Sequence, residues 1–439
     1  MKISLVAARF LDLEESALTA PRRTALRGVA FVVPAILLLV FCVMAAPKIP
    51  VWDSWSWILW LQRIKTGEIG FRDLLLLTHI EHPYGFPTAV FVYLGSVWDY
   101  SLKPMAIMST LAVVANGAIL FHQSRKCGLH SIAALLAIAV ISLSCRQYEN
   151  VLFGFQLGFP LTVMFGLGAV MAAASTGRVV SIAGRSAALL VLLACLLCGS
   201  TSSAASFAVF PAVMVTFLLL SRRPLVLASL LVVLLAGLWL YHYVPVITAM
   251  NAGRPPVADI VKGLFILAGS PLFESIPASL ATGIVVICFF MVFAFIRRNG
   301  TDSERLMIAM GLLSLGFIGI LACGRGDMGG INPPRYATFA IPLVVAMISL
   351  TIGRIDYYWQ RRIAIPLIAL VIYSALIATR AGIAQAKLIG GDAKMLTQIV
   401  LKQGASSDAE IGKLNPGRTE LIRGLVMFLE QNRWNVFSR

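Results

Sequence analysis

Long apolar runs separated by short polar segments dominate the chain between residues 28 and 379. The first run, 28–46, is long enough to cross a bilayer, and the later runs are roughly 15 to 20 residues long. Because backbone in hydrocarbon must satisfy its own hydrogen bonds, each run is expected to form a helix. The later runs are 104–122, 131–145, 157–174, 186–199, 206–220, 224–243, 276–296, 305–322, 336–352 and 363–379. The pattern therefore predicts an all-α polytopic membrane protein with about eleven transmembrane helices.

Composition agrees with this class, since 59% of the residues are hydrophobic and 13% are charged. The net charge of +16 does not indicate nucleic-acid binding, because the cations lie in short clusters between apolar runs, as in cytoplasmic loops of membrane proteins. These clusters orient the chain with a cytoplasmic N-terminus, provided that the apolar run 84–98 is an interfacial helix and not a further span. The basic residues of the predicted cytoplasmic loops are Arg125 and Lys126, Arg178 and Arg185, Arg222 and Arg223, Arg297, Arg298 and Arg305, and Arg354, Arg361 and Arg362.

This topology divides the chain into three parts. Residues 1–27 form a cytoplasmic N-terminal segment, residues 28–379 form the transmembrane domain with a long first outer loop at 47–103, and residues 380–439 form an extracytoplasmic tail. The first run also resembles a cleavable signal peptide, but its length favours a retained anchor. Two amphipathic helices are predicted in the tail, near 383–403 and 417–432.

Acidic residues separate the functional classes. None of the predicted spans contains Asp or Glu, which disfavours a proton- or ion-coupled transporter. Carboxylates and aromatic side chains gather instead in the predicted outer loops, above all in the first outer loop. That distribution favours an enzyme that takes one substrate from the membrane and another from water.

The outer loops contain five short motifs: Trp52-Asp53-Ser54-Trp55, Glu81-His82-Pro83, Gln147-Tyr148-Glu149-Asn150, Gly154-Phe155-Gln156 and Arg335-Tyr336. With these motifs the chain resembles the GT-C glycosyltransferases, and in particular a bacterial membrane-protein branch of that superfamily. The resemblance covers most of residues 28–360, and His82 departs from the lysine often found at its position. It implies a GT-C-like helical bundle in the bacterial inner (plasma) membrane. It also implies an inverting transferase that moves a sugar from a polyprenyl-phosphate-linked donor to a glycan or glycolipid acceptor of the cell envelope.

Asp53 is the expected catalytic base, because the resemblance places a catalytic acid shortly after the first span. Partial loss of solvation near the lipid boundary is expected to raise its pKa and so make it a better proton acceptor. A helix cap before Ser54 and Trp55 is the alternative role. Glu81 and His82 are expected to assist by orienting the acceptor or binding phosphate, and a capped turn before Pro83 explains them equally well.

Arg325 and Arg335 lie in a Gly- and Pro-rich outer loop, where the positive-inside rule disfavours arginine. A guanidinium binds two phosphate oxygens at once, so both residues, with Tyr336, are candidates for the donor phosphate. Ion pairing with Asp327 or with lipid phosphates is the alternative role. No metal and no cofactor are expected, and the Cys195 and Cys198 pair is read as helix packing.

The remaining candidates bind the sugar or the acceptor. Trp52 and Trp55 can stack on sugar rings, although an aromatic belt at the membrane interface is the commoner reason for a cluster that also includes Trp57 and Trp60. Glu149, Asn150 and Gln156 can bond sugar hydroxyls or simply link the loop to its surroundings. Two rival functions remain, an O-antigen-type polymerase or ligase and a lipid-linked glycan flippase without chemistry.

Overall fold

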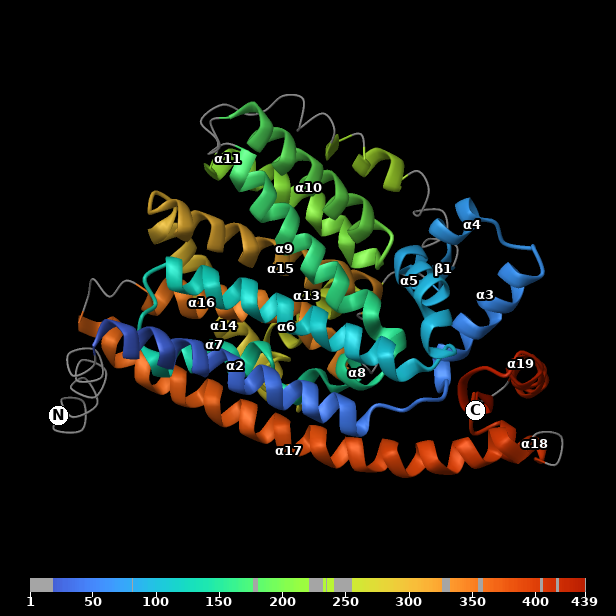
Figure 1. The fold of residues 1–439 in the computed structure, drawn as a ribbon. Coiled ribbons are helices and arrows are strands. Elements are labelled where there is room, and N and C mark those ends of the chain that lie inside the picture. Colours follow the sequence, from blue (N-terminus) through green and yellow to red (C-terminus); the bar gives the residue numbers. More distant parts are fainter. Residues whose placement is uncertain are drawn as a thin grey trace.

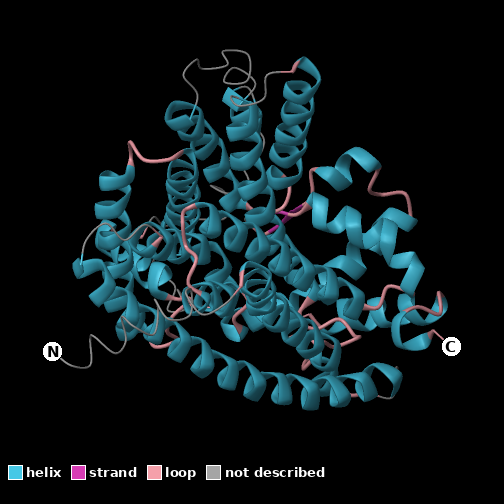
Figure 2. Cartoon of the chain, turned by 60° about the vertical axis from the view of Figure 1, so that its left-hand side comes forward, coloured by secondary structure: helices cyan, strands magenta, loops and turns pink. Residues whose placement is uncertain are grey.

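The computed structural model describes residues 19–80, 82–176, 181–220, 232–233, 235–240, 255–325, 332–353, 358–402, 406–415 and 418–438. These residues are almost entirely helical (Figure 1). Within them, extended structure is limited to the strands β1 (Thr78–His79) and β2 (His82–Pro83), which pair antiparallel (Figure 2).

Nine helices of the described residues are long and apolar enough to cross a membrane. Their main segments are α2 (Ala20–Ala45), α6 (Leu102–Lys126), α7 (Ile132–Ser142), α9 (Gly158–Thr176), α10 (Ile182–Ser200), α14 (Ile276–Arg297), α15 (Asp302–Arg325), α16 (Ala337–Ile352) and α17 (Tyr358–Lys402). The prediction of an all-α polytopic membrane protein is confirmed. The number eleven stays a prediction, because 206–220 contains the shorter helix α11 (Val209–Leu220) and most of 224–243 lies outside the described residues.

The core of the bundle is α16, in which every residue is buried. It contacts α7, α9, α14 and α15, whereas α2 and α17 run along one outer face (Figure 1). Short turns connect the spans at the predicted outer end. They are η3 (Cys145–Gln147), α8 (Tyr148–Leu152), η4 (Gly154–Leu157), η5 (Ala204–Ala208) and η6 (Pro334–Tyr336).

Loops predicted to share one side of the membrane do gather at the same end of the bundle. At the predicted cytoplasmic end, Arg27 donates from Nε to the His130 carbonyl. At the opposite end, the Phe86 amide donates to the Thr201 carbonyl. The grouping agrees with the predicted topology, while the orientation of either end toward the cytoplasm stays a prediction.

The segment between the runs 224–243 and 276–296 was expected to be an outer loop, but part of it is the helix α13 (Val257–Gly269). This helix packs against α14, α15 and α16. A glycine faces the partner backbone on each side of the α13–α14 contact, Gly269 opposite Ser279 and Gly283 opposite Phe265. This helix was not predicted from the sequence, because a helix of this length falls short of a span and escapes a hydropathy search.

The tail also differs from its prediction. A helix was expected near 383–403, separate from the last span, but α17 continues without a break from Tyr358 to Lys402. The second predicted helix is confirmed as α19 (Thr419–Gln431), flanked by α18 (Asp408–Ile411) and η8 (Asn435–Phe437). Nothing between 380 and 402 stops a helix, since no proline lies there and paired glycines only weaken it.

The first outer loop forms a small helical unit beside the bundle (Figure 1). Its elements are η1 (Trp52–Ser54), α3 (Trp55–Lys65), α4 (Phe71–Leu75), β1, β2, α5 (Gly85–Gly95) and η2 (Ser96–Trp98). The Trp57 ring stacks on Phe91 at 4.7 Å between ring centroids, and its Nε1 donates to Thr88 Oγ1. Trp55, Trp57 and Trp60 are buried in this unit. The aromatic-belt interpretation is therefore wrong for these three, because they form the core of the loop.

Candidate functional site

One small pocket, with a cavity volume of about 60 Å³, lies where the first outer loop meets the turns at the end of the bundle. Its polar lining comes from three separate parts of the chain, with Asp53 from η1, Glu149 and Gln156 from the α8–η4 region, and Arg335 from η6. The remaining lining residues are Val51, Trp52, Ser54, Phe153 and Phe155. Five residues predicted from the sequence as site residues thus share one pocket: Trp52, Asp53, Glu149, Gln156 and Arg335.

Asp53 lies in the 3₁₀ turn η1, and its side chain is 58% exposed. Its Oδ2 is 3.8 Å from Nε2 of His79, which is longer than a hydrogen bond. His79 lowers the pKa of the Asp53 carboxyl, and Arg335 and Arg418 lower it further, which together outweigh the rise caused by partial burial. The expected raised pKa is therefore wrong, since nearby positive charge favours the carboxylate more than lost solvation disfavours it.

Arg335 is held from two sides by residues of α8. Its Nη1 donates to Glu149 Oε2 at 2.7 Å, and its backbone carbonyl accepts a hydrogen bond from Asn150 Nδ2 at 2.9 Å. Asp327, which the alternative role gave as an ion-pair partner, lies outside the described residues. Glu149 and Asn150 therefore link α8 to η6, and of these two only Glu149 also lines the pocket.

Tyr336 and Arg325, the other candidates for phosphate binding, do not line this pocket. Tyr336 is buried, and its ring packs edge-on against Phe159. The Arg335 guanidinium lies 5.1 Å from the centroid of the Tyr336 ring, so the tyrosine stabilises the arginine by a cation–π contact. Arg325 is the last residue of α15.

His82 is buried in β2 with its ring edge-on to Phe159, and it does not line the pocket. Burial lowers its pKa to about 3, and the neighbouring His79 and Arg335 act in the same direction. The imidazole is therefore neutral at neutral pH. Glu81, its predicted companion, lies outside the described residues.

The two predicted sugar-stacking tryptophans differ in environment. Trp52 is 54% exposed, lines the pocket and packs against Phe153. Trp55 is only 1% exposed and belongs to the core of the loop. Of the two, only Trp52 can present a ring face to a ligand in this conformation.

Three residues in or behind the site were not predicted from the sequence. His79 precedes the Glu81-His82-Pro83 motif and reaches Asp53 because β1 and β2 turn the chain back on itself. Arg418, which acts on Asp53, comes from a tail that carried no recognised motif. Arg146 is buried and donates to Ser270 and Asn332, so it fixes the turns behind the pocket. A second histidine so close to the motif was the one signal available in the sequence.

Within the described residues, no group of three or more His, Cys, Asp or Glu side chains is placed to hold a metal ion. The expectation that no metal is required stays a prediction. Comparisons with protein-family models, with curated proteins and with solved structures found no match to this chain.

Proposed function

We propose that this protein is a membrane glycosyltransferase of the GT-C type, which transfers a sugar from a polyprenyl-phosphate-linked donor to a cell-envelope glycan or lipid acceptor. The observation that carries the proposal is the pocket in which a carboxylate, a guanidinium and an exposed tryptophan face the same space. Sugar transfer from a phosphate needs a base for the acceptor hydroxyl and positive charge for the leaving phosphate. Asp53 and Arg335 supply this pair of functions at one site.

Asp53 is the proposed general base. The carboxylate is ionised at neutral pH, and its exposed side chain can accept a hydrogen bond from an acceptor hydroxyl. Its lowered pKa makes it a weaker base than an ordinary aspartate. In the proposed step the hydroxyl proton passes to Asp53 while the hydroxyl oxygen attacks the anomeric carbon. The bond from that carbon to the phosphate oxygen breaks, its electron pair leaves with the lipid phosphate, and the anomeric configuration inverts.

Arg335 is the proposed ligand of the departing phosphate. One of its nitrogens is bonded to Glu149, but a guanidinium carries five N–H donors, so further donors can turn to phosphate oxygens. Phosphate would then compete with Glu149 for the same cation. Arg325, at the end of α15, is the second proposed cation for this group.

Trp52 and Gln156 are the proposed sugar contacts. Trp52 offers a ring that can stack on a pyranose, and Gln156 offers an amide that can donate to and accept from sugar hydroxyls. A volume of about 60 Å³ admits only part of a sugar. The pocket is therefore expected to widen at its exposed edge when the donor binds.

The test uses purified protein in lipid nanodiscs, incubated with a panel of polyprenyl-phosphate sugars and candidate acceptors, with products identified by mass. Asp53→Asn should lower the rate by about 10²- to 10⁴-fold, the range for loss of a general base. Glu68→Gln is the matched control, because it removes an exposed carboxylate of the same loop that pairs with Arg63. A wild-type rate in Asp53→Asn would refute the proposal. Movement of lipid-linked sugar between leaflets without a new glycosidic bond would favour a flippase instead.

A further inference from the structure

The tail meets the first outer loop at an unusual concentration of left-handed backbone. Six non-glycine residues of the described chain have positive φ angles: Trp52, Ile80, Asp99, Tyr100, Arg433 and Asn435. All except Ile80 lie where the loop and the tail contact each other. Side chains disfavour this region of φ, so such residues persist only where their surroundings impose the conformation.

At the start of the loop, the tail binds both backbone polar groups of Trp52, whose φ is 48°. The Trp52 amide donates to the Leu414 carbonyl at 3.2 Å. The Trp52 carbonyl accepts from Asn415 Nδ2 at 3.3 Å. Because Trp52 immediately precedes Asp53, its φ angle sets the direction in which the chain presents the carboxylate.

At the end of the loop, a second asparagine of the tail binds the carbonyls of Asp99 and Tyr100, whose φ angles are 52° and 54°. The backbone amide of Asn435 donates to the Asp99 carbonyl at 2.6 Å. Its side-chain Nδ2 donates to the carbonyls of Tyr100 at 2.9 Å and of Lys48 at 3.0 Å. One side chain therefore joins the beginning of the loop to its end.

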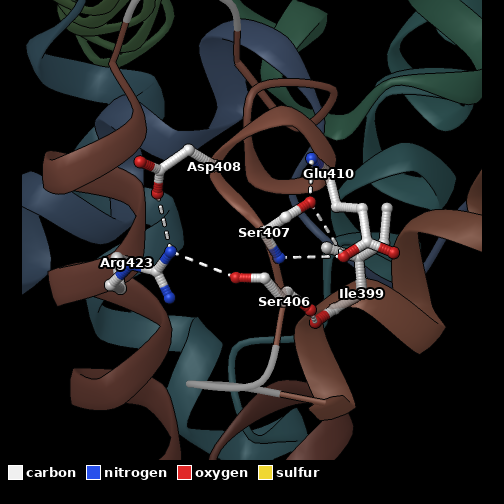
Figure 3. Close-up of polar contacts among 6 residues, drawn as sticks. All are labelled: Ile399, Ser406, Ser407, Asp408, Glu410 and Arg423. Carbon is white, nitrogen blue, oxygen red and sulfur yellow. Dashed lines mark hydrogen bonds and ion pairs between the residues drawn. The ribbon is translucent and has the colours of Figure 1, made fainter.

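The tail is itself well anchored, as Figure 3 shows. Arg423 donates to the Asp408 carboxylate at 2.8 Å and to the Ser406 carbonyl at 3.1 Å. Ser407 and Glu410 form a capping box at the start of α18. The Ser406 hydroxyl donates to the Ile399 carbonyl in α17. The Ser406 bond ties the tail to the end of α17, and the other bonds hold the tail together, so it can act as a fixed support for the loop.

We propose that the tail segments 406–415 and 418–438 position the pocket, with Asn415 and Asn435 as the positioning residues that hold the first outer loop in its left-handed conformation at both ends. The consequence for transfer rests on the proposed function of Asp53, whereas the consequence for the loop backbone does not. The tail also contributes Arg418, whose charge acts on Asp53.

The first test is hydrogen–deuterium exchange of the purified protein in nanodiscs, with no donor or acceptor added. Asn415→Ala should speed exchange in peptides covering residues 48–60, and Asn435→Gly should do so in peptides covering 48–60 and 96–103, by about five- to tenfold for the loss of one or two hydrogen bonds. Glycine is chosen at 435 because it suits the φ of 58°. Asn432→Ala is the control for a tail–loop bond that involves no left-handed residue, because that asparagine accepts from the Lys65 side chain of the loop and donates to the Phe428 carbonyl of the tail. Unchanged exchange in both test variants would overturn the proposal.

The second test asks whether the left-handed residue is what the tail controls. Trp52→Gly and Trp52→Ala both remove the ring, but only glycine adopts positive φ freely. Adding Asn415→Ala should therefore speed exchange clearly more in the Trp52→Ala background than in the Trp52→Gly background. Equal effects in the two backgrounds would mean that Asn415 does not act through the conformation of residue 52.

Activity provides a separate readout. In an active protein, Asn415→Ala should lower kcat about tenfold with little change in the KM for the donor, because the misplaced base affects the reacting complex more than donor binding. A change in KM with kcat unchanged would contradict a positioning role. If the wild-type protein transfers no sugar while the exchange results hold, the proposed function fails and the structural role of the tail stands.

Discussion

Nε2 of His79 faces Oδ2 of Asp53 across 3.8 Å. The imidazole is 14% exposed and packs edge-on against the rings of Trp60 and Phe155, whereas the carboxylate is 58% exposed. The histidine is therefore fixed by its neighbours, and the aspartate is the partner that is free to meet a ligand. The electrostatic state of Asp53 depends on a residue outside every recognised motif.

Replacing His79 should raise the pKa of Asp53. His79→Phe keeps an aromatic ring in the packed position but removes the interaction that lowers this pKa most, while partial burial continues to raise it. A lowered carboxyl pKa means that the proton leaves at lower pH, so the acid limb of kcat/KM should lie below that of an ordinary aspartate in the wild-type protein and move to higher pH in the variant. His130→Phe, a change at the opposite end of the bundle, should leave the limb in place. Identical profiles for His79→Phe and wild type would rule out this coupling.

Glu149 and Arg335 should have opposite effects on the affinity for phosphate. Glu149→Gln removes the competing carboxylate and should tighten binding of a polyprenyl phosphate, whereas Arg335→Gln should weaken it by about 10- to 100-fold, the range for one or two bonds to a charged group. Arg335→Lys should fall between wild type and Arg335→Gln, because lysine keeps the charge but not the planar fork. Titration of nanodisc-embedded protein with polyprenyl phosphate measures all three. Weaker binding in Glu149→Gln would show that this carboxylate supports the anion site and does not compete with it.

His82 should make the protein sensitive to mild acid. Its pKa is about 3 in the folded chain and near 6.5 when unfolded, so the unfolded chain takes up a proton first as pH falls. Stability should then decrease from pH 6.5 downward, by up to about 1.4 kcal/mol per pH unit. Thermal unfolding in nanodiscs between pH 4 and 8 tests this expectation. His82→Gln, which does not titrate, should show a flatter dependence over the same interval, and an equally steep one would assign the effect to other groups.

The α13–α14 contact should tolerate no side chain at Gly283. A methyl group there would collide with the Phe265 carbonyl, so the two helices would have to separate. Gly283→Ala should cost about 1 to 3 kcal/mol, seen as a lower midpoint of thermal unfolding. Gly319→Ala on α15 is the matched control, since its methyl group would meet no atom within 4 Å. Its midpoint should equal or exceed that of the wild type, and equal losses in both variants would point to an effect on helix formation alone.

The bundle and part of the pocket could be predicted from sequence because each rests on a local signal. Apolar runs of spanning length specify helices wherever backbone groups must bond internally. Asp53 was singled out by a motif after the first span. Arg335 was singled out by a motif of the same resemblance and by its place where the positive-inside rule disfavours arginine, and the structure places both residues in one pocket. For Arg335, the motif and the charge bias are separate signals that agree, and such agreement is a stronger guide than a motif alone.

The remaining features depend on tertiary neighbours that no local pattern encodes. The same tryptophans suit a membrane interface and a protein core, so hydropathy could not assign Trp57 to the interior of the loop. The direction of the pKa shift at Asp53 depends on His79, which reaches it through a pair of two-residue strands too short to produce an alternating pattern. The amphipathic helix α19 was predictable, but the surface it covers was not.

The bond between Trp52 and Asn415 also bears on how the protein is made. These partners are 363 positions apart, which corresponds to about 20 to 70 s of translation at typical rates. During that interval the nascent first loop has no Leu414 carbonyl to receive its amide and no Asn435 to join its ends. The pocket can therefore mature only after the last transmembrane helix has been inserted, so a ribosome that stalls before that point leaves a membrane-inserted but unfinished protein.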